Sequence, residues 1–157
     1  MYQEDGAPHA EVQTPSRRKI SPPLPFKIKP KVFGDWFPGS EEPQARPSTV
    51  LRVSDGWLVA HSHGEFGGWL EWFSVAGDST YEISHHHIVD FVEVEGELMA
   101  IEGLAHGQSS SGSLVRLVQL HNKWTTEVVG RLPSAPRAAV AQEGCVLIVH
   151  QQGLLRS

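Results

Sequence analysis

The stretch SDGWLVAHSHGEFGGWLEWFSVAGDSTYEI (residues 54–83) carries the pattern from which the fold can be predicted. It contains three short apolar runs, WLVAH (57–61), WLEWFSV (69–75) and TYEI (80–83). Short runs that are rich in Trp, Val and Thr and bounded by Gly, Ser and Asp are typical of β-strands. The segment AGDS (76–79) predicts a hairpin turn, because Asp tolerates the backbone angles of tight turns.

The same texture continues to the end of the sequence. Further short apolar runs are TVLRV, IVDFVEV, ELMAIEG, SLVRLVQL, TTEVV and CVLIV, and LHNKW (120–124) predicts another hairpin turn. No stretch of ten or more residues has the 3.6-residue period of an amphipathic helix. We therefore predict an all-β domain over residues 49–157.

Three segments of this domain, beginning at Ser54, Val94 and Gln142, can be aligned with one another. Each opens with an acid–Gly pair that precedes an apolar strand: Asp55-Gly56, Glu95-Gly96 and Glu143-Gly144. The three glycines are 40 and 48 residues apart. Propeller blades are about 40 to 50 residues long, so about two and a half blade-like repeats fit into the domain.

The order of turn, strand, Gly-bearing loop, strand, Trp, strand and LP..P resembles the blades of β-propeller proteins, as found in many uncharacterised bacterial chains. GRLPSAPRAAVAQEGCVLIV (130–149) is similar to a passage between blades, in which a proline-marked crossover leads to the next inner strand. The resemblance implies antiparallel blade-like repeats and carries no catalytic signature. The GH…WD markers of WD40 blades are missing from the sequence, so the resemblance does not extend to that family.

Closed propellers need at least four blades, and an open stack of fewer blades exposes apolar faces and strand edges. Three alternatives follow. The chain is part of a longer protein, or it closes as an oligomer by self-association, or it folds as an incomplete propeller in the form of a β-meander or β-sandwich.

A proline-rich segment precedes the predicted domain. Nine of the eleven prolines lie before residue 48, and residues 1–48 carry a net charge of +1 against −6 for the remainder. Because proline fixes φ and removes a donor, we predict a largely extended arm over 1–48, anchored on the domain by VFGDWF (32–37). Within it, RRKISPPLPFKIKPK (17–31) has the spacing of a polyproline ligand, although a stiff spacer explains it more simply.

Histidines and one carboxylate form the candidate binding site. His63 and His106 each precede a glycine at the same place in two repeats, so stacked repeats would bring them and Glu65 to one face. His61 alternates with His63 and would share its strand face. Imidazoles with a carboxylate suit zinc, which makes His61, His63, Glu65 and His106 candidate metal ligands. The alternative is that they are polar loop residues.

The glycines of GEFGG (64–68) predict a corner between two strands, because glycine adopts positive φ at no steric cost. Trp69 and Trp72 are three residues apart and therefore face opposite sides of a strand. One of them would seal the core while the other would lie on a surface or against the arm. With Phe66, they are the candidate partner-binding residues.

The totals exclude several classes of function. The net charge of −5 argues against non-specific nucleic-acid binding. The longest aliphatic run, 146–149, is far short of the roughly 20 residues that span a bilayer. The N-terminus has no basic start or apolar stretch, which favours a cytoplasmic location. The single cysteine, Cys145, excludes an internal disulfide.

We therefore predict a non-enzymatic β-repeat scaffold that needs no cofactor and binds a protein partner, or itself, through a loop face or strand edge. The alternative is a zinc- or small-ligand-binding β domain, perhaps hydrolytic, that uses the His61, His63, Glu65 and His106 set.

Overall fold

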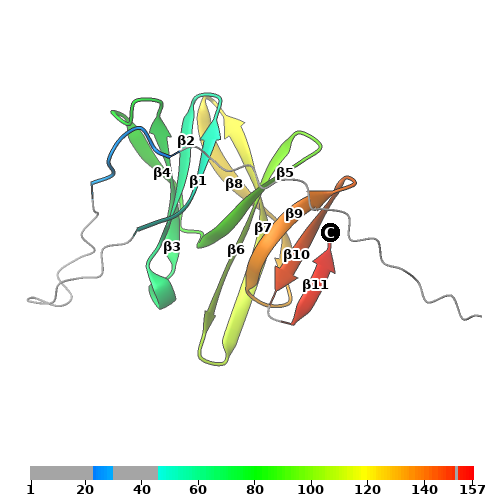
Figure 1. Ribbon diagram of the computed structural model, residues 1–157. Helices are drawn as coiled ribbons and strands as arrows, with labels where there is room; N and C mark the ends of the chain where they lie inside the picture. The colour runs from blue at the N-terminus through cyan, green and yellow to red at the C-terminus, as the bar shows by residue number, and fades with distance from the viewer. Residues whose placement is uncertain (1–22, 30–45, 151) are drawn as a thin grey trace, which may run out of the picture.

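The computed structural model describes residues 23–29, 46–150 and 152–157 (Figure 1). The described chain is all-β, with three antiparallel sheets and a single short 3-10 helix at Gly64–Phe66. In every sheet the strands that follow one another in sequence are also hydrogen-bonded neighbours, so each sheet is a meander. No helix in these residues is long and apolar enough to cross a membrane.

The three sheets are named in chain order. Sheet 1 consists of β1 (Arg46–Val53), β2 (Gly56–Ser62), β3 (Gly68–Ser74) and β4 (Thr80–Ser84). Sheet 2 consists of β5 (Ile88–Val94), β6 (Glu97–His106), β7 (Ser109–Leu120) and β8 (Lys123–Leu132). Sheet 3 consists of β9 (Pro136–Gln142), β10 (Cys145–His150) and β11 (Gly153–Arg156). Sheet 2 lies in the middle, where β5 contacts both β1 and β9 (Figure 1).

Tight turns connect the strands where the sequence predicts them. The turns at 95–96, 121–122 and 143–144 each contain two residues with positive φ, as a two-residue type I′ hairpin requires. In sheet 1 the prediction is one residue out of place, because Gly56 already pairs with Val53 and the turn is at 54–55.

The strands at the start and end of the sheets differ from the prediction. Each of the three aligned segments begins near the turn between the first and second strands of a sheet, so the predicted corner at 64–68 joins the second strand of sheet 1 to the third. The strands β9 and β11 are not among the predicted apolar runs, and β1 begins at Arg46 rather than at residue 49. The prolines explain the differences at β1 and β9. Pro47 and Pro136 argue against a strand in the sequence, yet proline is tolerated at the start of an edge strand, and β1 and β9 are both edge strands.

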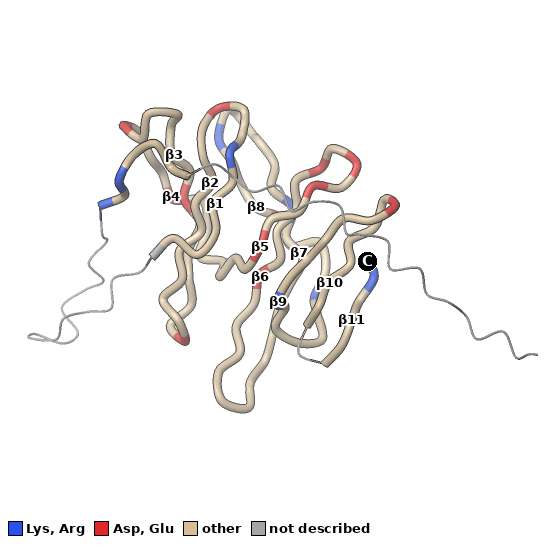
Figure 2. Tube along the Cα trace, viewed as in Figure 1, with Lys and Arg blue, Asp and Glu red and all other residues tan. Residues whose placement is uncertain are grey.

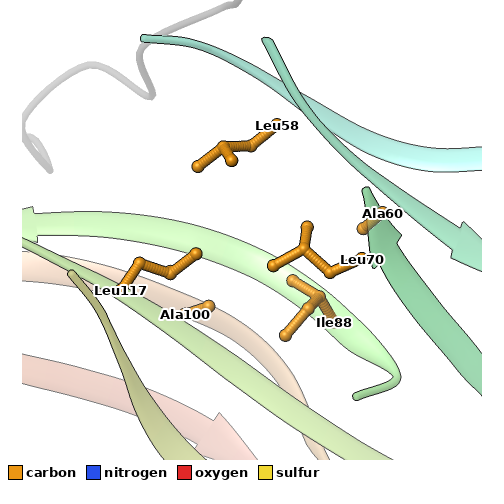
Figure 3. Close-up of a cluster of buried hydrophobic side chains, with 6 residues drawn as sticks. All are labelled: Leu58, Ala60, Leu70, Ile88, Ala100 and Leu117. Atoms are coloured by element: carbon orange, nitrogen blue, oxygen red, sulfur yellow. The ribbon is translucent and has the colours of Figure 1, made fainter. Parts of the chain in front are cut away.

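Two apolar clusters hold the sheets together. The cluster between sheets 1 and 2 consists of Leu58, Ala60, Leu70, Ile88, Ala100 and Leu117 (Figure 3). The cluster between sheets 2 and 3 consists of Val92, Ile101, Leu114, Leu132, Val146 and Ile148. In Figure 3 the side chains of the first cluster lie between facing strands, with none larger than leucine. The meanders therefore pack face to face, as layers around shared aliphatic cores.

Part of the arm covers the other face of sheet 1. Leu24, Phe26 and Ile28 pack against a cluster formed by Trp57, Val59 and Phe73. The Phe26 and Phe73 ring centroids are 5.4 Å apart. The alternate arm residues 23, 25, 27 and 29 are exposed. The segment 23–29 thus covers sheet 1 with its apolar side chains, with a bend at 25–26, whereas the predicted anchor at 32–37 lies outside the described residues.

The arm needs a glycine beneath it. Gly77, in the predicted turn 76–79, has a φ of +76°, and a Cβ there would lie 2.3 Å from Cγ of Phe26. We expect Gly77→Ala to lower the free energy of unfolding by about 1–3 kcal/mol, because it adds backbone strain and displaces the arm. Urea-induced unfolding of the full chain measures this.

The matched control is Gly130→Ala. A Cβ at Gly130 meets nothing within 4 Å and its φ is not positive, so alanine should be neutral or slightly stabilising in the β8 strand. Equal effects of the two substitutions would contradict the role assigned to Gly77.

Candidate functional site

The loop that joins β2 to β3 and the turn that joins β6 to β7 lie close together. Nδ1 of His106 is 2.9 Å from Oε2 of Glu65, and both side chains are more than half exposed. The structure therefore brings together two of the four predicted metal ligands at one end of the sheets.

His61 and His63 do not join them. The His61 side chain is buried, with Nε2 2.9 Å from Oε2 of Glu71. Its ring stacks on Trp69 with 4.5 Å between centroids. His63 lies beyond the end of β2, and its ring is 5.3 Å from that of Phe66. The prediction that His61 and His63 share one strand face is therefore wrong, because the strand ends between them.

A zinc site needs more donors than these loops provide. Tetrahedral zinc in a catalytic site takes three protein ligands, and structural zinc takes four. Within the part of the chain that the structure describes, no group of three or more His, Cys, Asp or Glu side chains is placed to hold a metal ion. Glu65 and His106 form an exposed contact between an imidazole and a carboxylate, which contributes little in water.

The three predicted partner-binding aromatic residues have different surroundings. Trp69 is buried against His61. Trp72 packs against the core between sheets 1 and 2, and its ring stacks on Tyr81 at 5.1 Å. The two tryptophans thus face opposite sides of β3, as predicted. Phe66 is the exposed one of the three, with 75% of its surface accessible.

Sequence reasoning missed a serine–histidine contact beside these loops. Nε2 of His87 is 2.9 Å from Oγ of Ser62, and His87 lines a cavity of about 400 Å³ together with Glu65 and Arg137. A nucleophilic serine needs a base that a third group orients. Among the described residues, Nδ1 of His87 has no hydrogen-bond partner. Within the described residues, the geometry thus shows a Ser62–His87 hydrogen bond without a side chain that orients the imidazole from its other nitrogen.

His87 gives stability a pH dependence. Burial lowers its pKa below the ordinary value of 6.5, against the opposing effects of Glu102 and the Gly103 backbone. The unfolded chain therefore takes up this proton first, and the free energy of unfolding falls as the pH decreases from about 6.5 through the lower pKa of the folded chain.

We expect His87→Gln to remove part of this loss of stability. Urea unfolding of wild type and variant between pH 8 and pH 5 should show a shallower decline for the variant. Parallel curves for the two proteins would contradict this assignment.

Sheet 3 has an exposed apolar face, which is identified from equivalent strand positions in the three sheets. The first hairpins of the three sheets close with the pairs Val53–Gly56, Val94–Glu97 and Gln142–Cys145. Positions can be counted from these closing pairs along the second strand of each sheet and then across to the third strand. Three sets of residues occupy equivalent positions on one face of the three sheets: Leu58, Met99 and Leu147; Ala60, Ile101 and Val149; Leu70, Leu114 and Leu154. We call this face of each sheet its trailing face, and the opposite face its leading face.

The trailing face is covered in two sheets and open in the third. In sheets 1 and 2 it packs against the following sheet, so that Leu70 and Leu114 are 0% and 6% exposed. In sheet 3 the corresponding Leu154 is 66% exposed. Val149 is 47% exposed, whereas its two counterparts are fully buried. Sheet 3 thus presents to solvent a surface of the kind that the molecule elsewhere buries.

A groove of about 1260 Å³ runs along this open face. Leu147, Val149 and Leu154 form one side, the first strands β1, β5 and β9 contribute to the lining, and Pro23 and Leu24 of the arm complete it. Figure 2 shows acidic residues at several of the hairpin turns, while Arg137 and Arg156 are the charged residues of β9 to β11. Arg156 pairs with Leu147 and thus lies on the open face, beside the apolar side chains Leu147, Val149 and Leu154.

The equivalence of Leu70 and Leu154 can be tested directly. We expect Leu70→Ala to lower the free energy of unfolding by about 2–5 kcal/mol, since it leaves a cavity in the core. Leu154→Ala should change it by less than about 0.5 kcal/mol, because the side chain is mostly in water. Urea unfolding at low protein concentration measures both. Similar losses for the two variants would show that the face is covered in the isolated chain.

No family model matches the chain, and no curated protein or solved structure is significantly similar to it.

Proposed function

We propose that the chain is a non-enzymatic β-repeat scaffold that binds a protein partner through the trailing face of sheet 3. The observation that carries the proposal is the exposure of Leu154 and Val149 at positions that are buried in sheets 1 and 2. Contiguous exposed apolar surfaces of this kind are typical of interaction sites.

The proposal interprets the three meanders as consecutive blade-like repeats. Their first hairpins correspond residue by residue, and their faces pack in the same order, trailing face on leading face. The three repeats are fewer than the four that a closed propeller requires, and among the described residues no further sheet covers the trailing face of the third.

The internal packing also indicates the kind of partner. Inside the molecule, a trailing face is covered by a β-sheet whose facing side chains are mostly aliphatic. A partner that presents such a sheet would bury Leu154 and Val149, each contributing up to about 1.5–3 kcal/mol of transfer free energy. The outer edge of β11 also remains unpaired within sheet 3, and an edge of this kind accepts an added strand.

Site-specific photocrosslinking tests the proposal. A photoreactive residue at position 154 should crosslink, in cells that express the chain, to a defined protein, which is then identified and purified. Position 120 is the matched control, because Leu120 is also strongly exposed, at 58%, but lies at the end of β7 on sheet 2.

The purified partner then distinguishes specific from incidental contact. Leu154→Asp should weaken its binding at least about tenfold, because a carboxylate would be buried in an apolar interface, whereas Leu120→Asp should not. Titration calorimetry measures both. Equal crosslinking at the two positions, or binding that survives Leu154→Asp, would reject the face as the binding site.

A further inference from the structure

The open trailing face has a counterpart at the other end of the same molecule. The leading face of sheet 2 packs against sheet 1, and that of sheet 3 packs against sheet 2. Val59, Ala100 and Ile148 occupy one corresponding position on the three leading faces. Sheet 1 alone has a leading face that no sheet covers among the described residues. The arm covers it instead.

The arm is a smaller cover than a sheet. It contributes three apolar side chains, Leu24, Phe26 and Ile28, from a single segment whose alternate residues are exposed. A neighbouring sheet contributes side chains from several strands, as the cluster between sheets 1 and 2 shows. The apolar part of the leading face of sheet 1, formed by Trp57, Val59 and Phe73, is therefore occupied by a single segment that a neighbouring sheet can replace. The same face continues to His61 and Glu71, which are buried and contact each other.

We propose that the trailing face of sheet 3 in one copy binds the leading face of sheet 1 in a second copy, in place of residues 23–29. This inference rests on the proposed function and names the partner as a second copy of the chain. Two such contacts related by a two-fold axis close the assembly and leave no apolar end face free. The closed dimer would contain six blade-like repeats, within the range of four to eight found in propellers.

The arm and the second copy compete for one face, so the arm sets the balance between monomer and dimer. Light scattering after size-exclusion chromatography should give about 17.3 kDa for wild type at micromolar concentration. Phe26→Ser, which removes the aromatic contact of the arm with Phe73, should shift the mass to twice that value. Ile28→Ser is a second, milder variant at the same segment, and circular dichroism confirms that both keep their β-structure.

Two additions test the contact itself. Leu154→Asp combined with Phe26→Ser should restore the monomer, whereas Leu120→Asp combined with Phe26→Ser should leave the dimer intact. A synthetic peptide of residues 21–31, added to Phe26→Ser protein, should also restore the monomer by occupying the vacated face.

The outcomes separate this inference from the proposed function. A folded Phe26→Ser protein that remains monomeric overturns the dimer, while specific crosslinking from position 154 to a different protein would still support partner binding. A wild-type dimer that Leu154→Asp dissociates without any effect of the arm variants overturns the competition with the arm. Open-ended oligomers in place of a dimer overturn the two-fold closure.

Discussion

The stacking of one β-sheet on the next is the interaction on which the rest of this structure depends. Each meander is apolar on two faces, and a sheet of three or four strands cannot bury both by itself. Sheet 2 meets this requirement because it lies between the other two sheets, with Ala100 in the cluster on one of its faces and Ile101 in the cluster on the other. Sheets 1 and 3 each have one face that the stack does not cover, and the distinctive features of the molecule lie on these two faces.

The chain treats its two end faces differently. On sheet 1 an extended segment with Phe26 at its centre covers the aromatic cluster around Trp57, and Gly77 makes room for it. On sheet 3, at the opposite end of the stack, Val149 and Leu154 are exposed. If both ends of the stack were open, copies of the chain would associate through them, since leading and trailing faces are complementary. A cover on one end suppresses this association while leaving the other end available.

The sequence predicted the class of fold because alternation and turn chemistry are local properties. The Asn122 turn, the acid–Gly turns after β5 and β9, and the opposite orientations of Trp69 and Trp72 follow from neighbouring residues alone. The strand β9 was missed because its sequence, PRAAVAQ, combines proline with residues of low strand propensity. The contact of His61 with Glu71 depends on the register between two strands, which no local pattern reveals.

The difference between local patterns and strand register also applies to the candidate site, which the sequence predicts in the loops and the structure indicates on a sheet face. Histidines attract attention in a sequence because of their chemistry, yet His85 with Glu82 and His106 with Glu65 form exposed contacts between an imidazole and a carboxylate. Even when charged, exposed contacts of this kind are typically worth less than about 1 kcal/mol. Leu154 attracts no attention in a sequence, because an isolated exposed leucine is ordinary. It becomes informative only beside Leu70 and Leu114, where the registers show that the same position is buried twice and exposed once. Leu154 thus marks apolar surface on sheet 3 that is buried at the equivalent positions of sheets 1 and 2 and uncovered here.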